Sequence, residues 1–515
     1  MSSDTFGSTT DGIDRREQSL LERIAANPEP ALKWGLVAAF LVAIEFGALV
    51  AGVMAITHSA VLSVTAIIDV VFGLFSPELA SSVVDVQTAL TDVIGGLRQT
   101  AETIPTLLDR SVIPNQGYRL GPNGPWEGTF LGLSPAVAWA IRVVLVVAYS
   151  VFSFYWLFRG WLVYREHYRY ADWTPFDDMV DRLRGHRWGE FGIVVLVLFL
   201  TMALFGPSLG PTTVEQNIQS PYSHELTYFS EESGSVETIP VGDANFNSKS
   251  KGKGEENVAP MTYDDFDRFH PFGTLTNGRD LFTFMMSGAR ITMLVAGISM
   301  GLASLIAITL SLASSYYAGL VDLVTLTTAD GIVSVPRLLV LILVSIVFQG
   351  TWLYEVMDGG LLLALVFGLT TWPFLWRAVR GPALQVAESE WIDAAKSYGQ
   401  RPDRIMRKHM LPFVLGYLLV YASMSVGGII IGMSALSFLG NGLGISPPTP
   451  AWGRAISLGQ NYVSTQSWHI SFIPGIMIVI LVTGLNAFGD GIRDAIDPES
   501  EGESEDEAAA GGVAG

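Results

Sequence analysis

The residues of this chain with the clearest potential for a specific function form a basic segment between two long apolar runs. Its first part, Asp393 to Tyr398, has the pattern of a short helix that ends at Gly399. Pro402 can open a second helix, because proline is tolerated in a first helical turn. The cations of the segment are Lys396, Arg401, Arg404, Arg407 and Lys408. We expect a rigid cationic helix–turn–helix at a membrane surface, suited to binding a partner protein.

Motifs for covalent or metal chemistry are absent from the sequence. There is no cysteine, which excludes disulfides, thiolate catalysis and Cys-ligated zinc. The sequence has no G-x-x-x-x-G-K-[ST] phosphate loop, no H-E-x-x-H metal helix and no G-x-S-x-G nucleophile turn. Its seven histidines show no ligand spacing. We therefore expect no enzyme, no metal site and no cofactor bound by this chain.

Three more segments are rich in glycine, proline and polar residues. The first reads HPFGTLTNGRD over residues 270–280 and is followed by Gly288-Ala289-Arg290. The second reads SFLGNGLGISPPTPAWG over residues 437–453, and the third reads GDGIRDAIDP over residues 489–498. Glycine permits tight turns in such segments. The residue types indicate structured loops more than catalytic chemistry.

In their order along the chain, the four segments resemble motifs of the transmembrane subunits of binding-protein-dependent ABC importers, in particular the C-type permeases of the dipeptide, oligopeptide and nickel family. The resemblance covers roughly residues 270 to 498. The basic segment is similar to the coupling loop of that family, called the EAA loop. It departs from the family with Asp393 where glutamate is usual and with His409 where an aliphatic residue is common, and Thr276 replaces an aspartate in the first external motif.

The resemblance implies an all-α polytopic membrane protein with a C-terminal type I (MetI-like) permease core. It implies a permease subunit of an ATP-driven importer that translocates di- or oligopeptides, or a similar small solute, by alternating access. The implied partners are a second homologous permease subunit, two cytoplasmic ABC ATPases that hold ATP and magnesium, an extracytoplasmic binding protein and the lipid bilayer, with no nucleic acid. The sequence does not identify the cargo.

The resemblance also assigns residues to sites. The implied ATPase-coupling residues are Asp393, Ala394, Ala395, Gly399, Arg404, Leu411 and Pro412. The implied contacts with the binding protein are Phe272, Gly273, Arg279, Asp280, Pro447, Pro448 and Trp452. For the first external segment the alternative is a structured loop with no ligand role.

Apolar runs long enough to cross about 30 Å of hydrocarbon predict eight membrane helices. They are Leu32–Ile56, Ala136–Phe158, Phe191–Leu209, Ile291–Tyr317, Val321–Phe348, Leu361–Trp376, Phe413–Leu439 and Phe472–Phe488. A weaker run, residues 60–75, precedes an amphipathic stretch, residues 77–97. We interpret these two as a helical hairpin on the outer face, with a ninth crossing as the alternative.

Arginines predict the orientation of the chain, because cytoplasmic loops of membrane proteins are basic. They crowd the connection 159–187 and the coupling loop, so eight crossings in the cell membrane would leave both termini cytoplasmic. The expected chain begins with a cytoplasmic N-terminus (1–31), followed by an extra helix pair with an external insertion and a basic loop (32–188). A first family helix with an acidic external segment comes next (189–290). The permease core, with its coupling loop near 378–412, covers residues 291–498, and an acidic disordered tail ends the chain (499–515).

The chain is half hydrophobic, 15% charged and carries a formal charge of −19. Its acidic residues gather in the external segment 215–267 and in the tail. One explanation is a high-salt source, which with the family resemblance suggests a haloarchaeon. The other is simply two solvated segments.

Two acidic residues lie inside apolar runs, where an ionisable group is a functional candidate by default. Asp330 stands with Asp322 and Pro336 in a pattern of the permease class, although Thr327 replaces a common arginine. Asp330 could line a polar site, or it could bond across the bundle or pair with Arg337. Glu45 could be protonated or paired with a partner subunit, and it leaves open an ATP-independent secondary carrier or a membrane receptor.

Overall fold

The computed structural model describes residues 19–496 apart from a few short gaps. Those gaps are residues 55–56, 59–60, 62–76, 105, 107–108, 122–123, 171–173, 254–255 and 441–442. The expected acidic tail (499–515), most of the cytoplasmic N-terminus and nearly all of the weak apolar run 60–75 therefore lie outside the described residues. The chain divides into two compact units. Unit 1 comprises residues 1–114 and 140–178, and unit 2 comprises residues 115–139 and 179–515.

Unit 1 is helical. Its elements are α2 (Leu20–Ala26), α3 (Pro28–Ile44), a helix over Phe46–Met54, α5 (Pro77–Glu102), the larger part of α6 (Pro135–Val163) and a π-helical turn, Tyr164–Tyr168. Ser19 and Glu22 close a reciprocal capping box that fixes the start of α2. Helix α5 confirms a helix in the amphipathic stretch, and the first apolar run is broken at Glu45 by a bend of 76°. The expectation of one continuous first helix was therefore wrong.

Helices α3 and α6 run antiparallel and are joined by polar contacts. Trp34 Nε1 donates to the carbonyl of Trp156 at 3.0 Å, and Trp156 Nε1 donates to the carbonyl of Trp34 at 3.1 Å. Further along, the Tyr149 hydroxyl donates to the Leu41 carbonyl at 2.8 Å. Gly160 leaves room for the Trp34 ring, since a Cβ there would lie 2.7 Å from it.

Unit 2 contains the C-terminal bundle. Its long helices are α8 (Arg187–Leu209), α10 (Leu281–Tyr317), α11 (Gly319–Ser334), α12 (Arg337–Val347), α14 (Gly360–Ala387), α17 (Leu411–Leu439) and α19 (His469–Ile496). Glycines allow close crossing between α8 and α19, because a Cβ on Gly192 would lie 2.4 Å from the backbone nitrogen of Phe488. The bundle core is built from large buried side chains, such as Trp376 and Phe367.

The structure is compatible with the predicted eight crossings. Six helices in the described part of the chain are long and apolar enough to span a membrane, and two bent helix pairs bring the total to as many as eight. The second bent pair is α11 and α12, with an angle of 78°. Pro336 lies at the break, as expected from a residue that cannot continue a helix.

A small β-rich part of unit 2 lies in the connections outside the bundle. It pairs β1 (Tyr118–Arg119) with β2 (Trp126–Glu127), β3 (Glu225–Ser230) with β4 (Ser235–Pro240), and β5 (Thr262–Tyr263) with β6 (Phe269–His270), all antiparallel. In the pairing of β3 with β4, Glu225 lies opposite Pro240 and Ser230 lies opposite Ser235. Leu226 packs with Val241 and Ala244 of α9 (Val241–Asn247) and with Phe266 in a compact apolar core.

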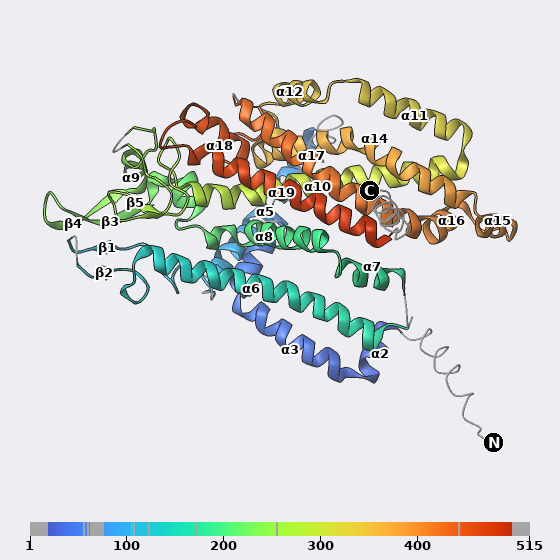
Figure 1. The fold of residues 1–515 in the computed structure, drawn as a ribbon, viewed down its shortest axis with the longest axis horizontal. Coiled ribbons are helices and arrows are strands. Elements are labelled where there is room, and N and C mark those ends of the chain that lie inside the picture. The colour runs from blue at the N-terminus through green and yellow to red at the C-terminus, as the bar shows by residue number, and fades with distance from the viewer. Residues whose placement is uncertain are drawn as a thin grey trace, which may run out of the picture. The chain divides into compact units, whose positions relative to one another are not determined.

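The remaining short elements connect the spans. Helix α7 (Pro175–Leu183) precedes α8, α13 (Trp352–Glu355) precedes α14, and α18 (Trp452–Gly459) precedes α19. Between α14 and α17 lie α15 (Glu390–Ser397), α16 (Pro402–Ile405) and a π-helical turn, Met406–Met410. Figure 1 shows α15 and α16 at the end of unit 2 opposite to β3, β4 and α9. The basic segment and the β-rich part thus lie at opposite ends of one bundle.

Candidate functional site

The turn between α15 and α16 is built around Gly399. Its backbone has φ of +71°, a left-handed conformation that glycine adopts without strain. The amide of Gly399 donates to the Lys396 carbonyl at 2.9 Å, and the amide of Gln400 donates to the Ala395 carbonyl at 3.1 Å. These two bonds form a complete Schellman motif, which ends α15 sharply. The predicted helix end at Gly399 is confirmed.

A second contact holds the two arms of this helix–turn–helix together. His409 Nε2 lies 3.2 Å from the Gln400 side-chain oxygen, so the turn is tied to the segment that leads into α17. Pro402 occupies the first turn of α16, as the sequence predicts. Leu411 and Pro412 form the first turn of α17, with Pro412 exposed and Leu411 half-buried. We call residues 389–412 the elbow.

The elbow has a buried face and an exposed face. Ile392, Ala395, Ile405 and Met410 are buried and pack the elbow against its own bundle, with Ala395 only 6% exposed. The exposed face carries Trp391, Asp393, Ala394, Tyr398 and Arg404, with Tyr398 88% exposed. The resemblance assigned both alanines to the ATPase contact. The structure leaves Ala394 accessible and gives Ala395 a packing role inside this chain.

At the other end of unit 2, the first external motif fixes the start of α10. Asp280 is the N-cap of α10, and its Oδ1 accepts from the Thr283 amide at 2.6 Å. Its other oxygen lies 2.9 Å from His270 Nδ1. Gly273 and Gly278 both have positive φ, and a Cβ on Gly278 would lie 1.6 Å from the Asn245 carbonyl oxygen. The motif therefore acts as architecture at the top of α10.

His270 also belongs to a buried charge cluster. Its Nε2 lies 3.3 Å from Asp264 Oδ2, and Arg268 Nη2 lies 2.7 Å from that same oxygen. Ser248 Oγ donates to Asp264 at 2.8 Å. Burial raises the pKa of the Asp264 carboxyl, but the Arg268 charge and the His270 bond outweigh it, so the pKa lies well below its usual range. Burial lowers the pKa of His270, yet its bonds to Asp264 and Asp280 raise it on balance.

The second external motif is anchored to the segment that precedes α14. The amide of Ser446 donates to the Asp358 carbonyl at 2.8 Å, and Thr449 Oγ1 donates to the Asp358 carboxylate at 2.6 Å. Trp452 is 2% exposed, and its indole donates to the Met285 carbonyl of α10 at 2.8 Å. Pro447 and Pro448 remain exposed.

The predicted contact residues for a binding protein thus fall into two groups. Gly273, Asp280 and Trp452 are buried and have structural roles within this chain. The side chains that are at least partly exposed are Phe272, Arg279, Pro447 and Pro448. Their contact with a binding protein stays a prediction. Burial lowers the pKa of the half-buried Arg279 guanidinium.

Three arginines and two aspartates form a ladder between α14 and the bent pair α11–α12. Arg380 binds Asp322 through two bonds of 2.8 and 2.5 Å, and Arg377 pairs with Asp330. Asp330 therefore bonds across the bundle to Arg377, and the alternative prediction of a pair between Asp330 and Arg337 is wrong. Arg337 instead donates to Thr371 at 2.5 Å and lies over the Phe367 ring at 4.8 Å.

Sequence reasoning missed two groups of residues. The cluster of Asp264, Arg268 and Ser248 has no local signal, because its members meet only through the fold of the β-rich part. The prediction of a basic loop counted Arg377 and Arg380 among the cations of the coupling loop, whereas both lie in α14. Their spacing also carried a signal for ion pairs. They stand three residues apart near the end of one apolar run, and two aspartates stand in a neighbouring run of opposite direction, a pattern typical of ion pairs between adjacent helices.

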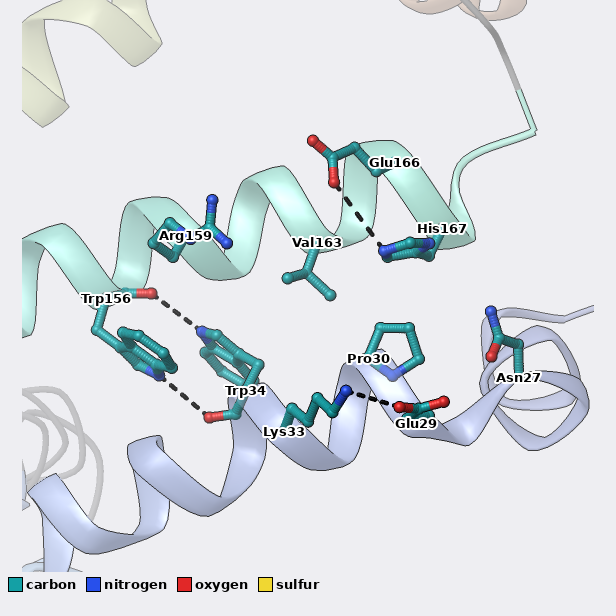
Figure 2. Close-up of a pocket in the computed structure, with 10 residues that line it drawn as sticks. All are labelled: Asn27, Glu29, Pro30, Lys33, Trp34, Trp156, Arg159, Val163, Glu166 and His167. Atoms are coloured by element: carbon teal, nitrogen blue, oxygen red, sulfur yellow. Dashed lines mark hydrogen bonds and ion pairs between the residues drawn. The ribbon is translucent and has the colours of Figure 1, made fainter.

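Unit 1 has a pocket of its own between α3 and the last turns of α6, with a volume of about 480 Å³ (Figure 2). Trp34 and Trp156 form one wall, Arg159 lies on α6, and Glu166 lies in the π-helical turn that follows it. On the rim, Lys33 pairs with Glu29 at 2.6 Å. Tryptophans beside charged groups are typical of the boundary between membrane and water.

Two family models match the chain. Residues 281–501 match the binding-protein-dependent transport system inner membrane component. This match begins at α10 and covers the bundle helices that follow it. Residues 174–225 match the N-terminal transmembrane domain of oligopeptide transport permease C, which covers α8.

Curated relatives agree with these matches. The dipeptide transport system permease protein DppC of Bacillus subtilis is 30% identical over 318 residues, which cover 62% of this chain and 84% of that protein. The probable D,D-dipeptide transport system permease protein DdpC of Escherichia coli is 34% identical over 233 residues, 45% of this chain and 74% of that protein. DppC of Alkalihalophilus pseudofirmus is 28% identical over 332 residues, 64% of this chain and 92% of that protein.

Proposed function

The chain belongs to the family of binding-protein-dependent transport system inner membrane components, and from this we infer that it is a multi-pass permease subunit of an ATP-driven peptide importer. The permease itself is not catalytic. The relatives are named for dipeptide and oligopeptide transport, which supports peptides of this size as the cargo.

In the proposed assembly, a second permease subunit completes the path. Two ATPases, one of which docks on the elbow, bind all the ATP and magnesium. An extracytoplasmic binding protein delivers the peptide at the opposite end of unit 2. Both termini are then cytoplasmic. The high-salt archaeal source stays a prediction.

The elbow is the observation that carries the coupling mechanism. Its Schellman turn and the contact between Gln400 and His409 make it a stiff body, and its buried face fixes it to the membrane helices. A push on the exposed face is therefore transmitted to α14 and α17 instead of being absorbed by a flexible loop. Rigid elements of this kind let the bundle move between outward-open and inward-open states.

The experiment is reconstitution of this chain with its three kinds of partner in liposomes, followed by ATP-dependent uptake of a labelled dipeptide. Ala394→Trp places a bulky side chain on the exposed face of the elbow, so ATPase co-purification and uptake should both fall. Leu131→Trp is the matched control, because Leu131 is 82% exposed and lies outside the elbow. Peptide movement by the chain alone, down a gradient and without ATP, would instead support the secondary carrier. Binding of peptide without any movement would support a receptor.

A further inference from the structure

Arg337 is the one arginine of the α11–α14 ladder whose described surroundings hold no carboxylate partner. The helices α11, α12 and α14 carry three arginines and two aspartates in all. Asp322 neutralises Arg380 and Asp330 neutralises Arg377. One positive charge therefore remains in excess, and it lies on Arg337.

The surroundings of Arg337 stabilise its charge without neutralising it. Thr371 accepts one hydrogen bond from Nη2, and the face of the Phe367 ring supplies a cation–π contact. The Nε atom is buried and has no hydrogen-bond partner. A buried donor without an acceptor costs free energy, and so does a charge inside a membrane span. Such a group is expected to have an anionic partner in the working state.

The position of Arg337 fits a site on a transport path. Arg337 follows the break at Pro336 in the interior of a bent span, and Thr371 lies near the middle of α14. A cavity of about 190 Å³ adjoins Arg337 and is also lined by Pro336, Val340, Thr370 and Phe374. At roughly 30 Å³ for each water molecule, this volume holds about six waters, enough for a carboxylate and a small group attached to it.

We propose that Arg337 and Thr371 form a carboxylate-binding site at the break between α11 and α12, which holds the C-terminal carboxylate of a peptide during translocation. A guanidinium binds a carboxylate with charge-assisted hydrogen bonds, and the terminal Nη atoms of Arg337 carry donors for this contact. The apolar side chains Val340 and Phe374 line the part of the cavity where the group attached to the carboxylate would lie. The site rests on the proposed function, because it takes its ligand from peptide import.

The test uses the complete importer in liposomes, with L-alanyl-L-alanine as the cargo. Two quantities are measured, the ATPase rate stimulated by the peptide-loaded binding protein and the peptide taken up per ATP hydrolysed. The stimulated ATPase rate of Arg337→Gln shows whether the complex still assembles and turns over. Uptake per ATP should fall about tenfold or more, as expected for the loss of a charge-assisted hydrogen bond. Arg337→Lys keeps the charge but lacks the planar guanidinium, so it should restore the uptake only in part.

Three outcomes would overturn the proposal in different ways. Unchanged uptake per ATP in Arg337→Gln would overturn the carboxylate site and leave the importer intact. Loss of the second permease subunit on purification of Arg337→Gln, with or without peptide, would show that Arg337 pairs with an acidic residue of that subunit. A wild-type complex that takes up no peptide would overturn the proposed function and the carboxylate site with it.

Discussion

His270 Nδ1 lies 2.9 Å from Asp280 Oδ2, and both side chains are 1% exposed. Asp280 caps α10, and His270 also contacts Asp264 inside the β-rich part. One imidazole thus links the first turn of a membrane helix to the folded external segment. The contact therefore ties the start of α10 to the β-rich part of the chain.

The stability of this link should depend on pH. The pKa of His270 is raised in the folded chain, so its contribution is fully present below the unfolded value near 6.5 and is lost as the pH rises through the folded value. The pKa of Asp264 is lowered, so its contribution is present above the unfolded value near 3.9 and is lost as the pH falls toward the folded value. The link should therefore be strongest between about pH 4 and 6.5 and weaken toward alkaline pH.

Hydrogen exchange of the full chain in nanodiscs, corrected for intrinsic rates, measures this effect. Peptides covering residues 258–280 should lose protection as the pH rises above the ordinary histidine pKa of about 6.5. His270→Gln should lower their protection at pH 6 by about 3 kcal/mol and flatten its pH dependence, because the buried Asp280 loses its charged partner and Asp264 keeps only Arg268. His224→Gln, in the same part of the chain but outside the cluster, is the control. Protection that rises with pH in the wild type would contradict the link.

Gly399→Ala should uncouple ATP hydrolysis from uptake. A Cβ in the left-handed conformation costs about 1–2 kcal/mol, so the end of α15 should loosen and the elbow should lose stiffness. Uptake per ATP in the reconstituted importer should fall several-fold. Gly381→Ala is the matched control: Gly381 is helical in α14, a Cβ there meets nothing within 4 Å, and alanine favours a helix. Equal effects of the two changes would argue against a role for the turn.

The parts of this fold that follow local rules could be predicted from the sequence. Gly399 and Pro402 predict the elbow, and Pro336 predicts the break between α11 and α12, because each acts on its own backbone. The break at Glu45 had no such signal. It coincides with close packing of Gly47, where a Cβ would lie 2.7 Å from the Ile104 carbonyl oxygen, a contact between distant segments. The pairing of Asp330 with Arg377 instead of Arg337 is likewise decided by how α11 lies against α14.

The orientation of the chain predicts opposite labelling of its two ends. The natural sequence lacks cysteine, so a thiol reagent can label the chain only at a single introduced cysteine. Tyr398→Cys in the elbow and Met261→Cys in the external segment both replace exposed side chains. In sealed cells, a membrane-impermeant maleimide should label Met261→Cys alone, and Tyr398→Cys should react only after permeabilisation. Reaction of Tyr398→Cys in sealed cells would place the elbow outside and end its assignment to ATPase coupling.

The two tryptophans of unit 1 predict that Gly160 is intolerant of a side chain. Trp34 and Trp156 exchange indole-to-carbonyl hydrogen bonds across α3 and α6, and Gly160 lies directly against the Trp34 ring. Gly160→Leu should push the ring away and break both bonds, each worth about 1 kcal/mol, with a further loss of packing. The thermal midpoint of the purified chain, followed by size-exclusion chromatography after heating, should fall by several degrees.

Gly35→Leu provides the comparison for this prediction. Gly35 neighbours Trp34 on the same helix, but a Cβ there meets nothing within 4 Å, so the substitution should leave the thermal midpoint nearly unchanged. Trp156→Phe removes one indole donor and keeps an aromatic ring, so it should cost less than Gly160→Leu. If Gly160→Leu were as stable as Gly35→Leu, α3 and α6 would not be held together at this contact, and the tryptophan pair would have no structural role in the extra helices.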